Sequence, residues 1–147
     1  MNKTVGALLD QKGRDIYSVE PTTTIYEALA LMAELNLGAV VVLDDAKLVG
    51  IMSERDYARK VILEGRSSLD TPVTDIMTHE VETVTEDVSV EDCMTRMTEG
   101  RFRHLPVVEG ESVIGLVSIG DIVKSMIVTQ QRLIGDLESY ITGSPRR

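Results

Sequence analysis

Apolar positions in the first half of the chain follow two spacings, one typical of helices and one of strands. The helical set follows Thr24, which together with Glu27 has the Ser/Thr-x-x-Glu pattern of a helix start. Its members recur three or four positions apart: Ile25, Ala28, Leu29, Met32 and Leu35. Two densely apolar runs, 39–43 and 48–52, then have the length of buried strands. The pattern predicts a helix followed by two strands.

Shorter signals flank these elements. Residues 4–10 have the pattern of a short amphipathic helix that ends at Gly13, and residues 16–19 alternate like a strand. Another helix is expected to begin at Ser53. Its inward-facing residues would be Tyr57, Val61 and Ile62. The first half therefore predicts the order strand, helix, strand, strand, helix after a short N-terminal helix.

The second half repeats the first at a constant offset of 65 positions, without a gap. Apolar positions hold while polar positions drift, as expected if one core geometry is built twice. The matched pairs include Val19/Val84, Ile25/Val90, Met32/Met97, Val42/Val107 and Ile51/Leu116. A unit of about 50 residues buries too little surface to be comfortably stable alone. The predicted fold class is α/β, of the α+β kind, with two pseudo-symmetric β-α-β-β-α repeats packed sheet to sheet.

The last part of the chain predicts a helix beyond the repeats. A helical pattern follows Asp121, is expected to break near Val128, and resumes over residues 133–141. Residues 143–147 are expected to be loose. The predicted division is repeat 1 at 8–64, repeat 2 at 73–128, and the C-terminal helix and tail at 129–147.

A seven-residue motif, Gly-h-h-Ser-x-x-Asp with h apolar, occurs in both repeats, at 50–56 and at 115–121. One interpretation is a nucleotide clamp, in which the carboxylate accepts hydrogen bonds from the two hydroxyls of a ribose and the helix start favours a phosphate. The other is a helix capping box, in which the serine and the acid bond to each other's backbone. A duplicated capping box would show the same repeat, so both interpretations stand.

The segment Arg101–His104 carries three candidate cations at the start of an apolar strand in an acidic protein. Phosphate is a natural partner for such groups. The alternative is ion pairing with neighbours such as Glu99 or Glu109. The aligned place in the first repeat, 37–40, has no cation, so the two sites are expected to differ.

These motifs resemble the CBS domain family, named after cystathionine β-synthase. The resemblance is carried by Val73–Thr78, by Arg103–Val108 and by the two Gly-h-h-Ser-x-x-Asp copies, and it covers roughly residues 8–128. It implies two β-α-β-β-α units joined through their sheets into a Bateman module, often as a homodimer. It also implies binding of adenosine-containing ligands (AMP, ADP, ATP, NAD or S-adenosylmethionine) in clefts between the units.

The resemblance assigns roles to residues of the second repeat. By this likeness Asp121 would hold the ribose, and Ser118 and Gly120 would lie near the ribose and the phosphate. Arg103 and His104 would contact the phosphate.

Residues of the first repeat would complete that cleft and form a second one. Tyr17 and Gly38 would line the adenine, and Lys12 would be an extra phosphate contact. The pseudo-symmetric second cleft would use Asp56, Ser53 and Arg55.

Composition excludes several other functions. A net charge of −9 and 3% aromatic residues argue against nucleic-acid partners, and no apolar run approaches the roughly 20 residues that span a membrane. The single cysteine, Cys93, cannot form an internal disulfide, which fits the cytoplasm. No Cys/His spacing suggests a metal site, and neither a P-loop nor a Rossmann glycine pattern occurs. No catalytic residue is therefore predicted.

The preferred hypothesis is a regulatory module that senses an adenine nucleotide, such as AMP, ATP or NAD, and requires no cofactor. It would act as a homodimer and pass its signal to a regulated protein partner. The alternatives are an interaction scaffold with degenerate clefts and a small enzyme that acts on a nucleotide, the latter without an evident nucleophile or metal site.

Overall fold

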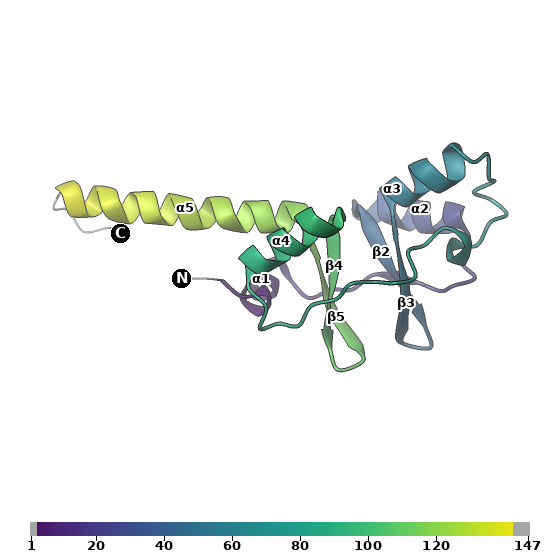
Figure 1. Cartoon of the computed structure of the whole chain (residues 1–147), viewed down its shortest axis with the longest axis horizontal. Coiled ribbons are helices and arrows are strands. Elements are labelled where there is room, and N and C mark those ends of the chain that lie inside the picture. The colour runs from purple at the N-terminus through teal and green to yellow at the C-terminus, as the bar shows by residue number, and fades with distance from the viewer. Residues whose placement is uncertain (1–2, 143–147) are drawn as a thin grey trace.

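The computed structural model describes residues 3–142 (Figure 1). The chain forms two similar units side by side, and a long C-terminal helix extends beyond the second unit. The first unit contains β1 (Ser18–Val19), α2 (Ile25–Leu35), β2 (Ala39–Asp44), β3 (Lys47–Ser53), α3 (Glu54–Tyr57) and the π-helix η1 (Ala58–Ile62). The second contains α4 (Val90–Gly100), β4 (His104–Glu109), β5 (Ser112–Ser118) and the start of α5 (Ile119–Thr142). Outside these lie α1 (Val5–Lys12) and the 3-10 turn η2 (Val73–Asp75).

The two β-hairpins confirm the 65-residue offset at the level of register. In the first unit Ala39 pairs with Ser53, and in the second His104 pairs with Ser118. Both hairpins shift register at the same point, after Val42 and after Val107. β1 pairs in parallel with β2, whereas its counterpart in the second unit is a single parallel bridge between Val84 and Val107. The predicted β-α-β-β-α order therefore holds, with first strands shorter than the pattern predicts.

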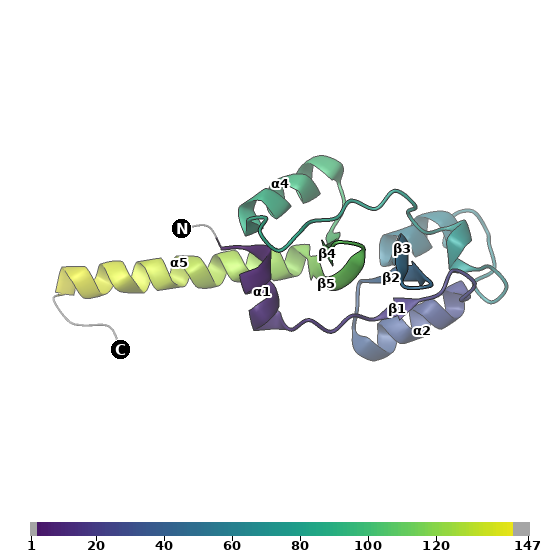
Figure 2. The same ribbon diagram turned by 90° about the horizontal axis from the view of Figure 1, so that it is seen from below.

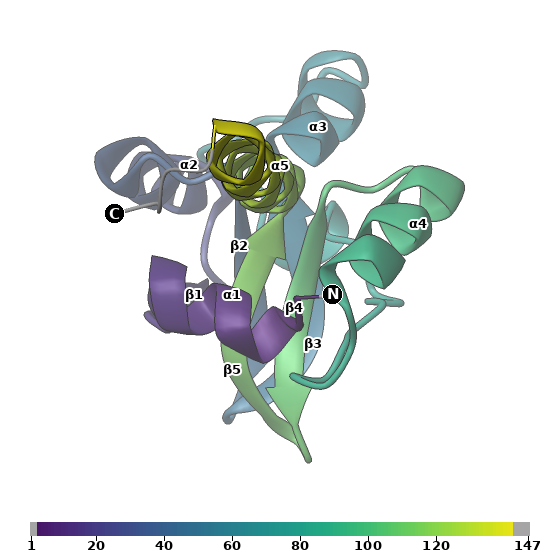
Figure 3. The same cartoon turned by 90° about the vertical axis from the view of Figure 1, so that its left-hand side faces the viewer.

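Each core contains a segment from outside its own unit. The second core includes Val5, Leu8 and Leu9 of α1, packed with residues such as Leu105 and Val117. The first core includes Val73, Ile76 and Met77, from the segment that precedes the second unit. Figure 2 shows the two connections crossing between the units, and Figure 3, seen along α5, shows α1 against the β4–β5 hairpin. The N-terminal helix thus belongs structurally to the second unit.

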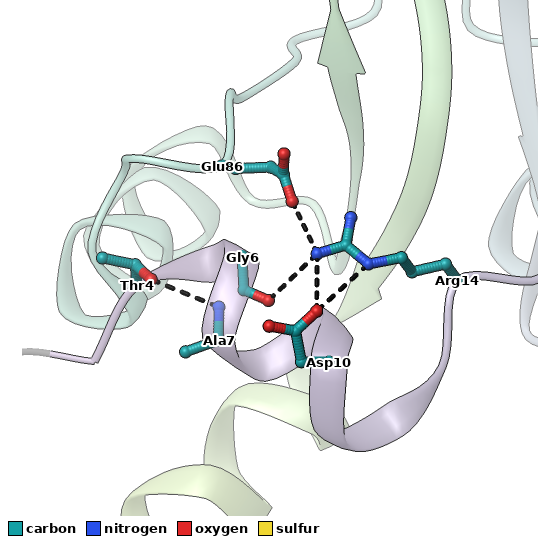
Figure 4. A network of polar contacts seen from close by, with 6 residues as sticks. All are labelled: Thr4, Gly6, Ala7, Asp10, Arg14 and Glu86. Atoms are coloured by element: carbon teal, nitrogen blue, oxygen red, sulfur yellow. Dashed lines mark hydrogen bonds and ion pairs between the residues drawn. The ribbon is translucent and has the colours of Figure 1, made fainter.

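An arginine holds the end of α1 in this position (Figure 4). The Arg14 guanidinium lies 2.6 Å from Glu86 Oε1 and 2.8 Å from Asp10 Oδ1, and it donates to the Gly6 carbonyl. Hydrogen bonds from the guanidinium to Asp10 and Glu86 raise the pKa of Arg14. Because these groups are solvent-exposed, the network orients the chain after α1 more than it stabilises the fold.

The first glycine of each Gly-h-h-Ser-x-x-Asp copy has a packing role. A Cβ at Gly115 would lie 2.8 Å from both Leu9 methyl carbons, and a Cβ at Gly50 would lie 2.3 Å from Met77 Sδ. Leu9 and Met77 belong to the two crossing segments, at 0% and 5% exposure. The motif therefore begins with glycine because a neighbouring segment lies directly against the strand.

We expect Gly115→Ala to lower the free energy of unfolding by about 1–3 kcal/mol, because the added methyl group overpacks a closed core. Urea denaturation followed by circular dichroism would measure the change. The matched control is Gly120→Ala, where the nearest atom to the new Cβ is Ser118 Oγ at 3.6 Å. That variant should be neutral or more stable, since alanine favours the helix. Equal effects at both positions would contradict the packing argument.

The predicted break in the last helix and the predicted inward position of Ile62 are both wrong. The helix does not break near Val128: α5 runs without interruption from Ile119 to Thr142, because no proline intervenes and the buried Ser125 continues the core-facing side. Ile62 does not face inward, being 60% exposed, whereas Val61 is 3% exposed. Neighbouring residues on a helix point about 100° apart, and here Val61 takes the direction of the core while Ile62 points to solvent. The expected loose tail, 143–147, lies outside the described residues.

Candidate functional site

Both Ser-x-x-Asp sequences form capping boxes. In the first unit Ser53 N donates to Asp56 Oδ2 at 2.9 Å and Asp56 N donates to Ser53 Oγ at 3.2 Å. In the second unit Ser118 N donates to Asp121 Oδ2 at 2.9 Å and Asp121 N donates to Ser118 Oγ at 3.1 Å. These bonds fix each carboxylate at the open end of a hairpin, where the second strand meets the following helix. Capping is therefore a real role of both aspartates, and it orients their second oxygens.

The two carboxylates differ in their cationic neighbours. Lys12 Nζ, at the end of α1, lies 2.6 Å from Asp121 Oδ2 and donates to the Leu116 carbonyl at 2.7 Å. Among the ion pairs of residues 3–142, the one that Asp56 forms is with Lys60, whose Nζ lies 3.6 Å from Asp56 Oδ1. Burial alone would raise the pKa of Asp121, but hydrogen bonds from Lys12 and Ser118 outweigh it and hold that pKa below its usual value. The sequence predicts Lys12 as a phosphate contact. In the structure its ammonium group forms an ion pair with Asp121.

A cavity of about 570 Å³ lies between the two units, and we call it cleft A. From the first unit its walls include Gly38, Ser53, Arg55 and Asp56. From the second unit and the connection before it come Glu80, Val81, Glu82, Arg101, Phe102, Arg103 and His104. The structure thus groups Arg103, His104 and Gly38 with Asp56, whereas the sequence-based assignment grouped them with Asp121.

A smaller cavity of about 220 Å³, cleft B, is related to cleft A by the repeat offset. It is lined by Lys12, Gly13, Asp15, Ile16, Tyr17, Leu37, Ala39, Val41 and Leu116. Adding 65 to several of these positions gives lining residues of cleft A. Asp15, Ile16 and Tyr17 thereby correspond to Glu80, Val81 and Glu82. Lys12 corresponds to Met77, which is buried in the first core, so only cleft B has a lysine at this place.

Of the remaining predicted residues, Asp121 and Ser118 lie near cleft B, whereas Gly120 lies elsewhere. Asp121 reaches it through its bond to Lys12, and Ser118 caps the same helix. Gly120 lines a separate apolar groove along α5. Residues 80–82 and Arg59 were missed as lining residues of cleft A. Applying the repeat offset to Tyr17 and its neighbours would have found residues 80–82 in advance.

The charges of cleft A suit a ligand with both an anionic and a hydrogen-bonding part. Four arginines and four acids line it: Arg55, Arg59, Arg101 and Arg103 with Glu54, Asp56, Glu80 and Glu82. Within residues 3–142, neither Arg101 nor Arg103 forms an ion pair, so the predicted alternative of pairing with Glu99 or Glu109 is wrong there. Arg55 Nη1 donates to the Arg101 carbonyl at 3.2 Å and so links the two units.

His104 lies at the seam between the units and is not one of the cations. A Cβ on Gly38 would be 3.1 Å from its Nε2, so glycine at position 38 gives the imidazole room beside the first unit. Burial lowers the pKa of His104; the Asp121 carboxylate raises it, and Lys12 and Arg103 lower it further. The imidazole is therefore mostly neutral at pH 7, and it can accept or donate a hydrogen bond.

The described part of the chain does not favour a metal site or a reactive thiol. Residues 3–142 contain no cluster of three or more His, Cys, Asp or Glu side chains that could hold a metal ion. Burial raises the pKa of the Cys93 thiol to about 11, which leaves it protonated at neutral pH. Among the described helices, none has the length and apolar character to cross a membrane.

Comparison with known proteins identifies the family. The CBS domain model matches residues 12–63 and 73–128. The Arabidopsis thaliana protein CBSX3, mitochondrial, is 43% identical over 125 residues, which cover 82% of this chain and 61% of that protein. The Bacillus subtilis protein YhcV is 31% identical over 118 residues, 80% of this chain and 84% of the relative.

Solved structures show the same architecture. A structure described as a putative signal-transduction protein with CBS domains, from Burkholderia ambifaria, is 50% identical with a TM-score of 0.85, covering 87% of this chain and 96% of that one. The CBS domain pair of protein MJ0100, solved with 5′-methylthioadenosine and S-adenosyl-L-methionine, has a TM-score of 0.78 at 24% identity, covering 88% and 99%. At that identity the likeness shows the fold.

Proposed function

The chain belongs to the CBS domain family, and we propose that it is a regulatory module that binds a phosphorylated adenosine compound in cleft A. The observation that carries the proposal is a cavity of about 570 Å³ between the units, within the usual size range of small-molecule sites. Arg101 and Arg103, at its wall, have no carboxylate partner in the described residues. The ligands named for the MJ0100 structure support the adenosine part.

The residues that line cleft A provide suitable contacts for the ribose, the adenine and the phosphate of such a ligand. The capping box holds Asp56 Oδ2, so Asp56 Oδ1 is oriented to accept from the ribose hydroxyls. The side chains of Ile51, Val81 and Phe102 provide apolar surface for the adenine ring. The guanidinium groups favour phosphate, which selects AMP, ADP, ATP or NAD over the cationic S-adenosylmethionine.

Cleft B is proposed as the weaker site. Its volume is about 220 Å³, and Asp121 already accepts a charge-assisted bond from Lys12. A ribose bound by Asp121 Oδ1 would lie beside the Lys12 ammonium, which contacts the other oxygen of the same carboxylate. Ligand binding in cleft A would then change how the two units contact each other, and the homodimer or a regulated protein partner would respond to the change. No catalytic step is proposed. The cytoplasmic location stays a prediction, because one relative's name places it in the mitochondrion.

A thermal-shift titration tests this proposal. Adenine nucleotides at about 100 times their dissociation constant should stabilise the native protein by about 2.7 kcal/mol and raise its melting temperature. AMP, ADP, ATP and NAD should act at lower concentrations than S-adenosylmethionine, and inorganic phosphate and adenine serve as controls for the two halves of the ligand. The absence of a shift with every compound would favour the scaffold alternative. Turnover of ATP or NAD would favour the enzyme alternative.

A further inference from the structure

The turn that joins α4 to β4 contains a residue in an uncommon backbone conformation. Arg101, which ends α4, has φ 57° and ψ 39°, in the left-handed region that glycine and asparagine favour. Its N–H donates to the Met97 carbonyl, and the Phe102 N–H donates to the same oxygen at 3.2 Å. The hydrogen bonds are those of a regular helix end. The amino acid is the exception, because a side chain with a Cβ lowers stability in this conformation.

The equivalent turn of the first unit has a residue that suits the same conformation. Asn36 lies 65 positions before Arg101 and ends α2 with φ 55° and ψ 50°. Leu37 N donates to the Met32 carbonyl at 2.8 Å, as Phe102 N donates to Met97 in the second unit. Asparagine enters the left-handed region more readily than arginine does. The two turns therefore share one backbone geometry, and only the second holds a poorly suited residue.

A glycine precedes Arg101, and it has a separate role. A Cβ added to Gly100 would lie 2.1 Å from Phe102 Cε1, so this glycine makes room for the phenyl ring. The Arg101 side chain is exposed, and its guanidinium forms no hydrogen bond or ion pair within residues 3–142. Neither packing nor pairing among the described residues therefore accounts for an arginine at position 101.

Arg101 lies at the seam between the units, where it borders cleft A. Its carbonyl accepts a hydrogen bond from Arg55 Nη1 of the first unit at 3.2 Å, and the residue is among those that line the cleft. Figure 1 shows the connection from α4 to β4 on the side of the second unit that faces the first. The lining of cleft B includes Leu37 of the equivalent turn but not Asn36. The left-handed arginine thus occurs in the turn that borders the larger cavity.

Backbone strain at the wall of a ligand site is commonly a functional feature. A guanidinium offers planar, paired donors that match phosphate oxygens, whereas adenine and ribose carry no negative charge for it to bind. We propose that Arg101 selects phosphorylated ligands over the unphosphorylated nucleoside in cleft A, and that arginine occupies this left-handed position for that role although it lowers the stability of the free protein. The inference rests on the nucleotide binding proposed above and adds a residue that determines its specificity.

Replacement by glycine tests both halves of the inference. Arg101→Gly keeps the left-handed turn and the carbonyl that accepts from Arg55, but it removes the guanidinium. The melting temperature of the free protein should rise by about 2–4 °C, because glycine adopts this conformation without strain. In isothermal titration calorimetry, the dissociation constant for ADP should rise roughly 10- to 100-fold, whereas that for adenosine should change less than about twofold.

Matched variants control for the backbone and for the charge. Asn36→Gly makes the same change at the equivalent turn and should leave ADP affinity within about twofold of the wild type. Arg96→Gln removes a positive charge from α4 that is paired with Asp92, and it should also leave ADP binding unchanged. Arg101→Lys keeps the charge and the left-handed Cβ, so its melting temperature should equal that of the wild type. Its ADP affinity should fall between those of the wild type and Arg101→Gly.

The outcomes distinguish this inference from the proposed function. A wild-type chain that binds neither ADP nor adenosine would overturn the proposed function, and with it the role of Arg101. If the wild type binds ADP and Arg101→Gly keeps the same preference for ADP over adenosine, the proposed function stands and the inference fails. Equal losses of affinity for both ligands would also overturn it, because Arg101 would then shape the cleft without selecting phosphate. A lower melting temperature for Arg101→Gly would overturn the stability half and show that the arginine charge stabilises the end of α4.

Discussion

Asp56→Ala is expected to reduce nucleotide affinity by roughly 10- to 100-fold, whereas Asp121→Ala should leave binding in cleft A within about twofold. A hydrogen bond to a charged group contributes about 1.5–3 kcal/mol, which corresponds to that range. Asp56 lines the larger cavity, and Asp121 is bonded to Lys12. Isothermal titration calorimetry with ADP, followed by AMP and ATP, would measure the dissociation constants.

The two aspartates are matched controls for each other. Each accepts the same backbone bond in a capping box, so each substitution should cost about 1 kcal/mol of stability. A difference in nucleotide affinity between the two variants is then due to which cleft holds the ligand, because the loss of the helix cap is common to both. If Asp121→Ala abolished binding and Asp56→Ala did not, the ligand would occupy cleft B. Equal affinities for both variants and the wild type would leave the aspartates with capping as their only role.

Leu9→Ala is expected to lower the free energy of unfolding by about 2–5 kcal/mol. Leu9 lies before residue 12, where the family match begins, yet it is fully buried in the second core and packs on Gly115. Removing its methyl groups leaves a cavity between α1 and β5. Urea unfolding with and without nucleotide would measure the loss.

The control for this substitution is Leu63→Ala. Leu63 is 79% exposed, so the same change in chemistry should cost under about 0.5 kcal/mol. A small change in the free energy of unfolding of Leu9→Ala would mean that α1 does not stabilise the second core. Two separate unfolding transitions in Leu9→Ala, with the first unit unaffected, would show that the units are only weakly coupled.

The internal repeat made much of the fold predictable. Apolar positions at the 65-residue offset placed both hairpins, and the structure extends this match to the register shifts after Val42 and Val107. The position of α1 was not predictable in this way. Its pattern shows that one face is apolar, but the second unit that covers this face lies about 80 to 110 residues further along the chain. The continuity of α5 past Val128 was missed because the apolar spacing becomes irregular there, although no residue that terminates a helix is present.

The candidate site was partly predictable. The doubled motif found the two aspartates and their serines, and the arginine-rich segment found one wall of cleft A. Which wall faces which aspartate depends on how the units pack, and sequence spacing does not encode this. The contact between Lys12 and Asp121 joins positions 109 apart, and the low pKa of His104 results from burial, so both require coordinates.

The exchange of segments between the two cores also bears on how the chain matures at the ribosome. The first core is incomplete until residues 73–77 have emerged, and α1, which precedes both units in the chain, has no docking surface until β5 is synthesised. Leu8 and Leu9 therefore stay exposed to solvent or to a chaperone until the second unit has been synthesised. Either half released alone would lack a piece of its interior, so premature termination between the repeats should yield a polypeptide destined for degradation.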